Sequence, residues 1–258
     1  MTGPVLDARA VEVVIRGKPI LHGADLAVGG GELVAVVGPN GAGKSTLVRA
    51  CAGIQRTSGG SVRWAGEDVR QLAGRRLARL RAFVPQRSQV PAGLAVRAAV
   101  SVGRSPHIGP LRRAGQADRQ AVERAMARVG VLELAERRLT TLSGGELQRV
   151  QIAVALAQEA PTLIADEPTS HLDLGATAEA ARLLRGLADD GLAIVLVLHD
   201  LALAAAIADR VVIVSEGRSV ATGTPGEVFD PERLARIWRV DASLESGALS
   251  VAWLGGGR

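Results

Sequence analysis

A glycine-rich run near residue 40 ends in a lysine and two hydroxyl residues, a combination suited to binding phosphate. The run consists of Gly38, Pro39, Asn40, Gly41, Ala42, Gly43, Lys44, Ser45 and Thr46. It matches G-x-x-x-x-G-K-[ST], in which small residues let backbone amides point inward around phosphate oxygens. Lys44 would bring a compact positive charge to the outer phosphates, and the hydroxyl of Ser45 would reach Mg²⁺. The run therefore predicts a site for a nucleotide and its metal ion.

The lysine in this run stands out against the rest of the chain. Of the 31 basic residues, only Lys18 and Lys44 are lysines, and the others are arginines. A lysine acts as a point charge, which suits the end of a phosphate chain. The alternative is a tight turn with a chance lysine. An apolar run before the glycines and a helical pattern after them favour the phosphate loop.

Two acidic residues and a histidine follow later apolar runs. Asp166 and Glu167 come directly after Leu163-Ile164-Ala165, and His199 follows the run from 194 to 198. Asp166 would hold Mg²⁺, directly or through water, and Glu167 would act as general base on an attacking water. His199 would contact the γ-phosphate. Alone, each could simply end a strand, but beside a phosphate loop they predict a hydrolytic site.

The elements that must position these residues alternate between strands and helices. Strands are expected within 10–37, near 61–65, and over 162–166, 193–198, 211–214 and 219–221. Helices are expected over about 44–51 and 176–188, and 70–157 has a mostly helical pattern. Continuous apolar strands separated by helices indicate an α/β fold with a mainly parallel sheet. The long helical stretch would then be an insertion into that sheet.

Composition excludes several other classes of protein. The 258 residues are 47% hydrophobic and 22% charged, which is typical of a globular chain. The single cysteine, Cys51, excludes an internal disulfide. A net charge of +5 permits anionic partners, whereas 2% aromatic residues and no tyrosine disfavour a nucleic-acid stacking surface. His199-Asp200 interrupts the most apolar stretch, so we expect no membrane span and a cytoplasmic location.

A further motif gives the chain a family resemblance. Leu142-Ser143-Gly144-Gly145-Glu146 resembles the signature of ABC ATPases, and the order of motifs over about 8–230 is also theirs. The resemblance implies a P-loop NTPase fold of the ABC type, with a mainly parallel sheet core and an early antiparallel β subdomain. It also implies one nucleotide-binding domain over 1–240, an inserted helical subdomain over about 88–158, and a short C-terminal extension over 241–258.

The resemblance also implies how the site is assembled. In this family two ATP-binding subunits pack head to tail, so a homodimer is expected, with ATP and Mg²⁺ as cofactors. Ser143, Gly144 and Gly145 would touch the γ-phosphate held by the partner's Lys44. Gln86 would help to place Mg²⁺ and water and would sense a membrane partner, so the expected metal ligands are Ser45, Gln86 and Asp166. The expected catalytic residues are Lys44, Gln86, Glu167 and His199, and Asp173 would lie at the dimer seam.

Three stretches are similar to the ATPases of importers for iron chelates (siderophores), haem and vitamin B12. They are 103–109, 170–174 and 199–205. The resemblance implies an ATPase that powers import of a metal chelate across the bacterial inner membrane. The ATPase itself would lie peripherally on the cytoplasmic face of that membrane. Its partners would be polytopic permease subunits and, through the complex, a periplasmic or lipid-anchored substrate-binding protein, with no nucleic acid. Four arginines would face the membrane partner or form a solvated face: Arg97, Arg104, Arg112 and Arg113.

Three alternatives remain open at this point. The chain could serve an ABC transporter for another cargo. It could be a soluble ABC ATPase of translation or DNA repair, although it carries neither a second cassette nor a long coiled coil. It could also be a non-catalytic scaffold, although such proteins often lose the base or the signature, and Glu167 and Ser143 are both present.

Two positions depart from the family pattern. An aromatic residue usually stacks on adenine at the position aligned with Ile15, where this chain has an aliphatic side chain followed by Arg16. In the helix after the signature, Val154 stands where an arginine is usual. The first departure predicts weak discrimination between adenine and guanine nucleotides.

We therefore expect Ile15→Tyr to raise the preference for ATP over GTP. The added aromatic face is worth ~0.5–1.5 kcal/mol, or about 2- to 10-fold. Competition of ATP and GTP against a bound fluorescent nucleotide, compared between wild type and variant, measures this preference. An unchanged preference would contradict the adenine contact assigned to Ile15.

Overall fold

The continuous apolar runs become the central strands of a six-stranded sheet in the computed structural model, which describes residues 4–86, 91, 93–108, 113–245 and 247–252. Every residue of β3 (Leu33–Val37), β7 (Thr162–Asp166) and β8 (Ala193–Val197) is buried. The sheet order is β10-β9-β3-β8-β7-β6, and the neighbours from β9 to β6 run parallel. The carboxyl ends of β3, β7 and β8 therefore meet at one edge of the sheet.

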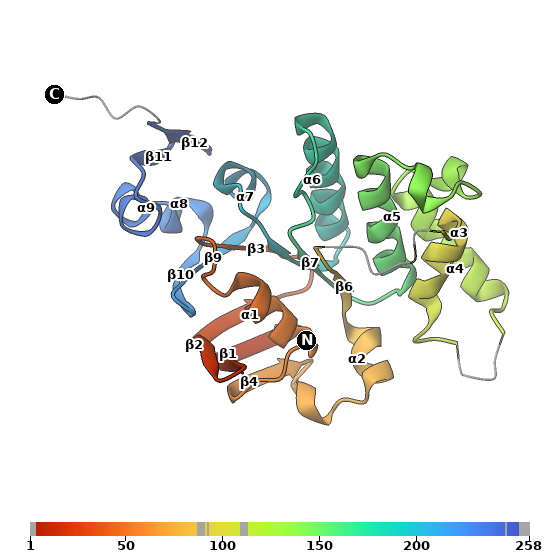
Figure 1. Ribbon diagram of the computed structural model, residues 1–258, viewed down its shortest axis with the longest axis horizontal. Coiled ribbons are helices and arrows are strands. Elements are labelled where there is room, and N and C mark those ends of the chain that lie inside the picture. The colour runs from red at the N-terminus through yellow and green to blue at the C-terminus, as the bar shows by residue number, and fades with distance from the viewer. Residues whose placement is uncertain (1–3, 87–90, 92, 109–112, 246, 253–258) are drawn as a thin grey trace.

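A second, antiparallel sheet is built from the early part of the chain. Its order is β2 (Lys18–Val28), β1 (Leu6–Ile15), β4 (Gly59–Trp64) and β5 (Glu67–Asp68). Helix α1 (Lys44–Cys51) packs in one apolar cluster with both sheets (Figure 1). The indole Nε1 of Trp64 donates to the carbonyl of Cys51 at 2.9 Å. The expected antiparallel β subdomain is confirmed, and it fixes α1 from one side.

The strands that complete the large sheet differ from the expectation at one edge. β9 (Arg210–Ser215) and β10 (Arg218–Gly223) lie where strands were expected. Within 70–157, however, a mostly helical pattern was expected, and the strand β6 (Ala82–Val84) was not predicted. β6 pairs in parallel with Leu163, Ile164 and Ala165 of β7. Three residues are too few to carry a period-two pattern, and a partner about 80 positions later in the chain stabilises the strand.

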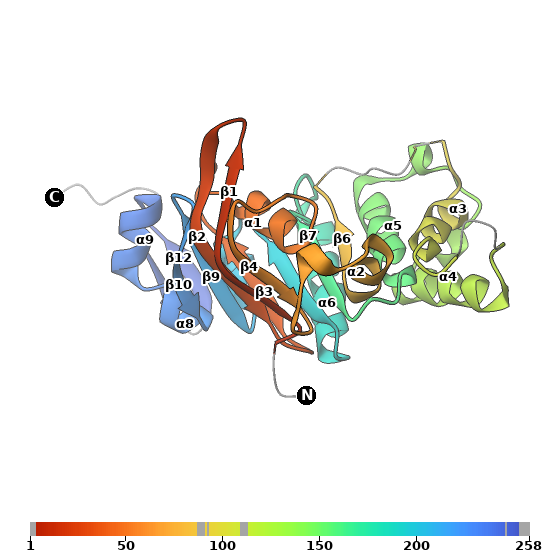
Figure 2. The same ribbon diagram turned by 90° about the horizontal axis from the view of Figure 1, so that it is seen from below.

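A group of helices lies at one end of the molecule (Figures 1 and 2). It contains α3 (Val96–Ser101), α4 (Gln116–Arg128) and α5 (Gly144–Ala157), with 3₁₀ turns at Val102–Arg104, Leu132–Leu134 and Leu139–Thr141. Helix α2 (Gly74–Leu80) precedes β6, and a 3₁₀ turn at Val69–Gln71 precedes α2. The described helices agree in kind with an inserted helical subdomain. Its expected boundaries near 88 and 158 stay predictions, and residue 88 lies outside the described residues.

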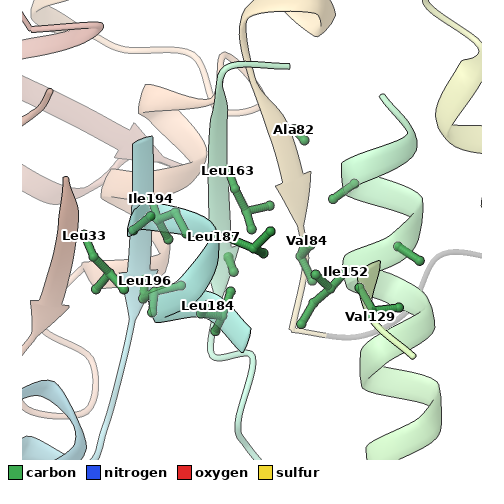
Figure 3. Close-up of a cluster of buried hydrophobic side chains, with 14 of the residues drawn as sticks. Leu33, Ala82, Val84, Val129, Ile152, Leu163, Leu184, Leu187, Ile194 and Leu196 are labelled. Carbon is green, nitrogen blue, oxygen red and sulfur yellow. The ribbon is translucent and has the colours of Figure 1, made fainter. Parts of the chain in front are cut away.

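The other face of the large sheet is covered by α6 (Leu174–Asp189). Figure 3 shows Leu184 and Leu187 of α6 lying with Leu163, Ile194 and Leu196 of the sheet. The chain then forms α7 (Leu201–Ile207), α8 (Pro225–Val228) and α9 (Pro231–Trp238). A hairpin of β11 (Ala242–Glu245) and β12 (Ala248–Val251) follows, at the end of the molecule away from the helical group (Figure 1). Leu244, Leu249 and Val251 pack against the core.

One glutamine joins three segments where the helical group meets the sheet. The Gln158 side chain donates to the carbonyls of Ala78 and Arg81 at the end of α2, the latter at 2.8 Å. The Gln158 carbonyl lies 2.8 Å from Nε2 of His107. Arg81 Nε in turn donates to the carbonyl of Ala52, just after α1, at 2.8 Å. The junction thus connects the ends of α1, α2 and α5.

The four arginines expected at a membrane partner or a solvated face are arranged differently from one another. Arg104 is 5% exposed, and it pairs with Asp118 at 3.2 Å and with Glu159 at 2.7 Å. The expectation is therefore wrong for Arg104, because its charge is neutralised inside the helical group. Arg97 pairs with Glu123 and Glu136 on an exposed face.

The structure says less about the other two arginines of this group. Arg113 is exposed, and Arg112 lies outside the described residues. Among the helices that the structure describes, none is both long and apolar enough to cross a bilayer.

The close approach of Gly103 to α5 gives a stability prediction. A Cβ on Gly103 would lie 2.1 Å from the carbonyl oxygen of Val154, so an alanine must displace backbone. We expect Gly103→Ala to lower the free energy of unfolding by ~1–3 kcal/mol in urea titrations. Gly186→Ala in α6 is the matched control, since its added Cβ meets no described heavy atom within 4 Å. It should raise stability by ~0.5–1 kcal/mol. Equal stability of both variants would contradict the close contact.

Candidate nucleotide site

The glycine-rich run joins the end of β3 to the start of α1. Gly38 has φ 154°, and a Cβ there would lie 2.0 Å from the carbonyl oxygen of Val214, so only glycine fits. Gly43 has φ 102° and directly precedes α1, so the loop amides collect at a helix N-terminus. That arrangement provides donors and a positive dipole end for an anion.

Lys44 lies inside this loop. It is 4% exposed, and its Nζ donates to the carbonyls of Gly38 at 2.7 Å and Pro39 at 3.0 Å. Burial lowers the pKa of Lys44, while the charges of Glu167 and Asp166 act in the opposite direction. The ammonium group is therefore held by carbonyl oxygens of the loop, and its predicted contact with phosphate stays a prediction.

Asp166 occupies the end of β7 and is wholly buried. Its Oδ1 accepts a hydrogen bond from Ser45 Oγ at 2.7 Å, and its Oδ2 accepts one from Arg49 Nη2 at 3.0 Å. Ser45 of α1 and Asp166 of β7 therefore bring two oxygen atoms together.

This donor set fits magnesium. Mg²⁺ takes oxygen ligands and usually combines one or two carboxylates with water and substrate phosphates. Among the described residues no group of three or more His, Cys, Asp or Glu could enclose a metal without such help. Ser45 and Asp166 are suited to a cation that a phosphate chain completes. The metal contact predicted for Gln86 stays a prediction, since the structure shows its amide nitrogen on Glu167.

Glu167 lies between two polar side chains. Gln86 Nε2 donates to Glu167 Oε2 at 2.5 Å, and His199 Nε2 lies 2.6 Å from Glu167 Oε1. The backbone of Glu167 has φ 57°, an uncommon conformation outside glycine, and its N–H donates to the carbonyl of Val197 at 3.2 Å. Strain of this kind persists where the surroundings impose it. The result is a carboxylate with a fixed direction.

These side chains line one cavity of about 500 Å³. Its lining consists of Ile20, Asn40, Gly41, Ala42, Gly43, Lys44, Ser45, Thr46, Gln86, Glu167 and His199. Gly38, Pro39 and Asp166 lie outside this lining and form hydrogen bonds with Lys44 and Ser45, which belong to it. The structure thus brings together the predicted loop, Gln86, Glu167 and His199.

Two hydrophobic residues near the cavity bear on the predicted nucleotide contact. Ile15 is 37% exposed at the end of β1 and is not among the lining residues, so its adenine contact stays a prediction. Ile20 lines the cavity and was not predicted from the sequence. No motif marks Ile20, because its place depends on how β2 lies against the loop.

The signature residues lie in a different groove. Ser143, Gly144 and Gly145 line a space of about 390 Å³ together with Asp173 and other residues at the starts of α5 and α6. Ser143 caps α5: its N–H donates to Glu146 Oε2 at 2.7 Å, and its Oγ accepts from the N–H of Glu146 at 3.3 Å. The hydrogen bond from the Ser143 N–H to the Glu146 carboxylate lowers the pKa of Glu146. The chain therefore carries the predicted site in two separate parts.

Arg49 is a residue near the site that sequence reasoning missed. The available signal was its spacing, since it follows Ser45 by four residues on a predicted helix and shares a helix face with it. Nothing in the sequence alone says that Asp166 lies opposite that face.

Comparison with known proteins gives consistent matches. The family described as ABC transporter matches residues 21–170. The cobalamin import ATP-binding protein BtuD of Halobacterium salinarum is 44% identical over 230 residues, which cover 89% of this chain and 57% of that protein. The chain thus spans little more than half the length of that curated relative. The hemin import ATP-binding protein HmuV of Streptomyces coelicolor is 45% identical over 237 residues, covering 92% of this chain and 84% of that protein.

A solved structure extends the similarity to three dimensions. The chain is 25% identical to an inward-facing metal-chelate type ABC transporter, with a TM-score of 0.82. The match covers 96% of both chains.

The buried lysine gives the first prediction at the site. Lys44→Ala should weaken ATP binding at least tenfold, because a charge-assisted contact to phosphate contributes ~1.5–3 kcal/mol. Titration with a fluorescent ATP analogue measures the loss, and a melting curve establishes that the variant is folded. Lys18→Ala removes the other lysine, which does not line the cavity, and should bind as wild type does. Equal affinities of the two variants would show that Lys44 does not contact phosphate.

Proposed function

This chain belongs to the ABC transporter family, and we propose that it binds ATP with Mg²⁺ and hydrolyses it to power import of a metal chelate. The observation that carries the proposal is the placement of Glu167. Gln86 and His199 hold its two oxygens at 2.5 and 2.6 Å, in the cavity that the phosphate loop lines. A carboxylate fixed beside a phosphate site is what activation of a water requires.

Each part of the site then has a task. The loop amides and Lys44 bind the β- and γ-phosphates, and Ser45, Asp166 and Gln86 hold Mg²⁺. The metal ion, when bound, neutralises charge on the phosphate oxygens. Glu167 accepts the proton of the attacking water. Gln86 and His199 keep the carboxylate aimed at that water, so catalysis rests on positioning rather than on covalent chemistry.

The divided site supports a dimer as the working form. The phosphate loop and the Ser143 groove lie in different cavities of one chain. Two copies packed head to tail would bring Ser143, Gly144 and Gly145 of one to the nucleotide of the other. Asp173, which lines the same groove, would then lie at the seam.

The proposed cargo and partners are inferred from the names of similar proteins. Proteins 41–45% identical to this chain are named hemin and cobalamin import ATP-binding proteins. A structural neighbour is of metal-chelate type. We therefore assign the chain to import of a haem, cobalamin or ferric siderophore type of chelate. It would act peripherally on the cytoplasmic face of the inner membrane, with polytopic permease subunits and a periplasmic or lipid-anchored binding protein.

The base assignment is tested by Glu167→Gln. This variant should bind ATP with wild-type affinity and lose at least 100-fold in hydrolysis rate, the lower range for removing a general base. Phosphate release and nucleotide binding are measured on the same preparation. Turnover at the wild-type rate would remove Glu167 as the base. An equal absence of turnover in wild type would favour a non-catalytic scaffold.

The transport assignment is tested by capture from native membranes. Tagged Glu167→Gln with ATP is purified from detergent-solubilised membranes, and co-purifying proteins are identified by mass. A polytopic membrane protein at equal stoichiometry is expected, and uptake of labelled hemin, cobalamin and ferric siderophore by the cells then identifies the cargo. Recovery of the bait alone, or with ribosomes or nucleic acid, would overturn the transport function and leave only an ATPase.

A further inference from the structure

The buried carboxylate of Asp166 has two different partners on one helix. Ser45 Oγ donates to Oδ1 at 2.7 Å, and Arg49 Nη2 donates to Oδ2 at 3.0 Å. Ser45 and Arg49 are four residues apart on α1, so one face of that helix holds both oxygens. The carboxylate is 0% exposed, so these contacts replace the water that would otherwise solvate it.

Each oxygen of the Asp166 carboxylate has its own partner. Oδ1 accepts from the hydroxyl that the proposed function assigns to Mg²⁺, whereas Oδ2 accepts from the guanidinium of Arg49. Rotation of the carboxylate would break the hydrogen bond to Arg49, so this bond favours the orientation in which Oδ1 faces Ser45. Groups that hold a metal ligand in this way fix its direction and contribute strongly to metal affinity.

We propose that Arg49 is a positioning residue for the Mg²⁺ site, acting through Asp166 and making no contact with the nucleotide. This inference rests on the proposed function. Arg49 keeps Oδ1 directed at Ser45, so that the two oxygens meet an incoming cation in a fixed geometry. The site then needs less rearrangement when Mg²⁺ arrives with ATP.

The charge of Arg49 acts in the opposite sense, because a guanidinium repels a nearby cation. The side chain of Arg49 is 44% exposed, however, and water screens a half-exposed charge. The hydrogen bond that orients Asp166, in contrast, ends on a wholly buried carboxylate, where water does not weaken it. We therefore expect loss of Arg49 to weaken metal binding.

A comparable ion pair elsewhere in the sheet provides a control. Arg210 Nε lies 2.7 Å from Glu32 Oε1, with side chains 28% and 23% exposed. This pair lies at the amino ends of β9 and β3, the edge of the sheet opposite the phosphate loop. Arg210→Met therefore removes a partly buried ion pair from the same sheet without touching the site.

The experiment compares Arg49→Met, Arg49→Lys and Arg210→Met with wild type. Affinity for a fluorescent ATP analogue is measured first in EDTA and then across a Mg²⁺ titration, and Mn²⁺ binding with ATP is followed by electron paramagnetic resonance. Melting curves in EDTA report the stability of each protein. The nucleotide readouts need no turnover.

Arg49→Met should bind the analogue in EDTA as wild type does but need about 10-fold more Mg²⁺ or Mn²⁺ for half saturation. Arg49→Lys should recover much of that loss, because Arg49 makes a single hydrogen bond to Asp166 Oδ2 and a lysine ammonium group can also donate one. Arg210→Met should match wild type in both readouts. If Arg49→Met loses thermal stability while its metal dependence stays at the wild-type value, Arg49 is structural and the inference falls.

Failure of the proposed function looks different. If wild-type protein does not bind the analogue with or without Mg²⁺, the nucleotide site itself is wrong. If wild type responds to Mg²⁺ and Arg49→Met responds equally, only the role of Arg49 is refuted. Should Arg49→Met be unfolded, Arg49→Lys carries the test. A folded Arg49→Lys protein should keep a small part of the loss and need more Mg²⁺ than wild type, and a wild-type metal dependence would then refute the role of Arg49.

Discussion

The nucleotide site depends on the burial of one carboxylate at the carboxyl end of a parallel sheet. Asp166 pairs in register with Val197 of β8 and is closed off from water. A buried charge is stable only when its oxygens are satisfied. Here α1 supplies both partners, Ser45 and Arg49. The same contacts that satisfy the charge therefore attach α1, and with it the phosphate loop, to the sheet.

Much of this arrangement follows from the sequence, because the strands that carry the site are apolar at every position and the loop has a distinctive pattern. The parallel order brings Lys44, Glu167 and His199 to one edge, as their positions after strands indicate. What was missed depends on contacts between distant segments. β6 exists because β7 pairs with it, and the place of Ile20 depends on packing of β2. Arg104 reads as a surface charge, and only the fold reveals Asp118 and Glu159 beside it.

The predicted site residues of one chain lie in two separate cavities, one around Glu167 and one around Ser143. One chain supplies every contact that holds Glu167: its backbone has a left-handed conformation, and Gln86 and His199 contact its two oxygens. Ser143, in contrast, uses its polar atoms to cap α5 and faces a separate groove. The side chains around Glu167 are thus held in place within one chain, whereas the signature residues line a groove outside that cavity.

The hydrogen bonds of Gln158 determine which nearby residues can be substituted without breaking the contact between the helices. Its side chain bonds to the carbonyls of Ala78 and Arg81, and its own carbonyl meets His107. Backbone carbonyls are present whatever residue occupies a position, so the side chains at the end of α2 can vary without breaking the junction. Arg104 and Asp118 are bound to each other through side chains, so a change in one demands a change in the other. Evolution can therefore remodel the surface of α2 while the ends of α1, α2 and α5 stay joined.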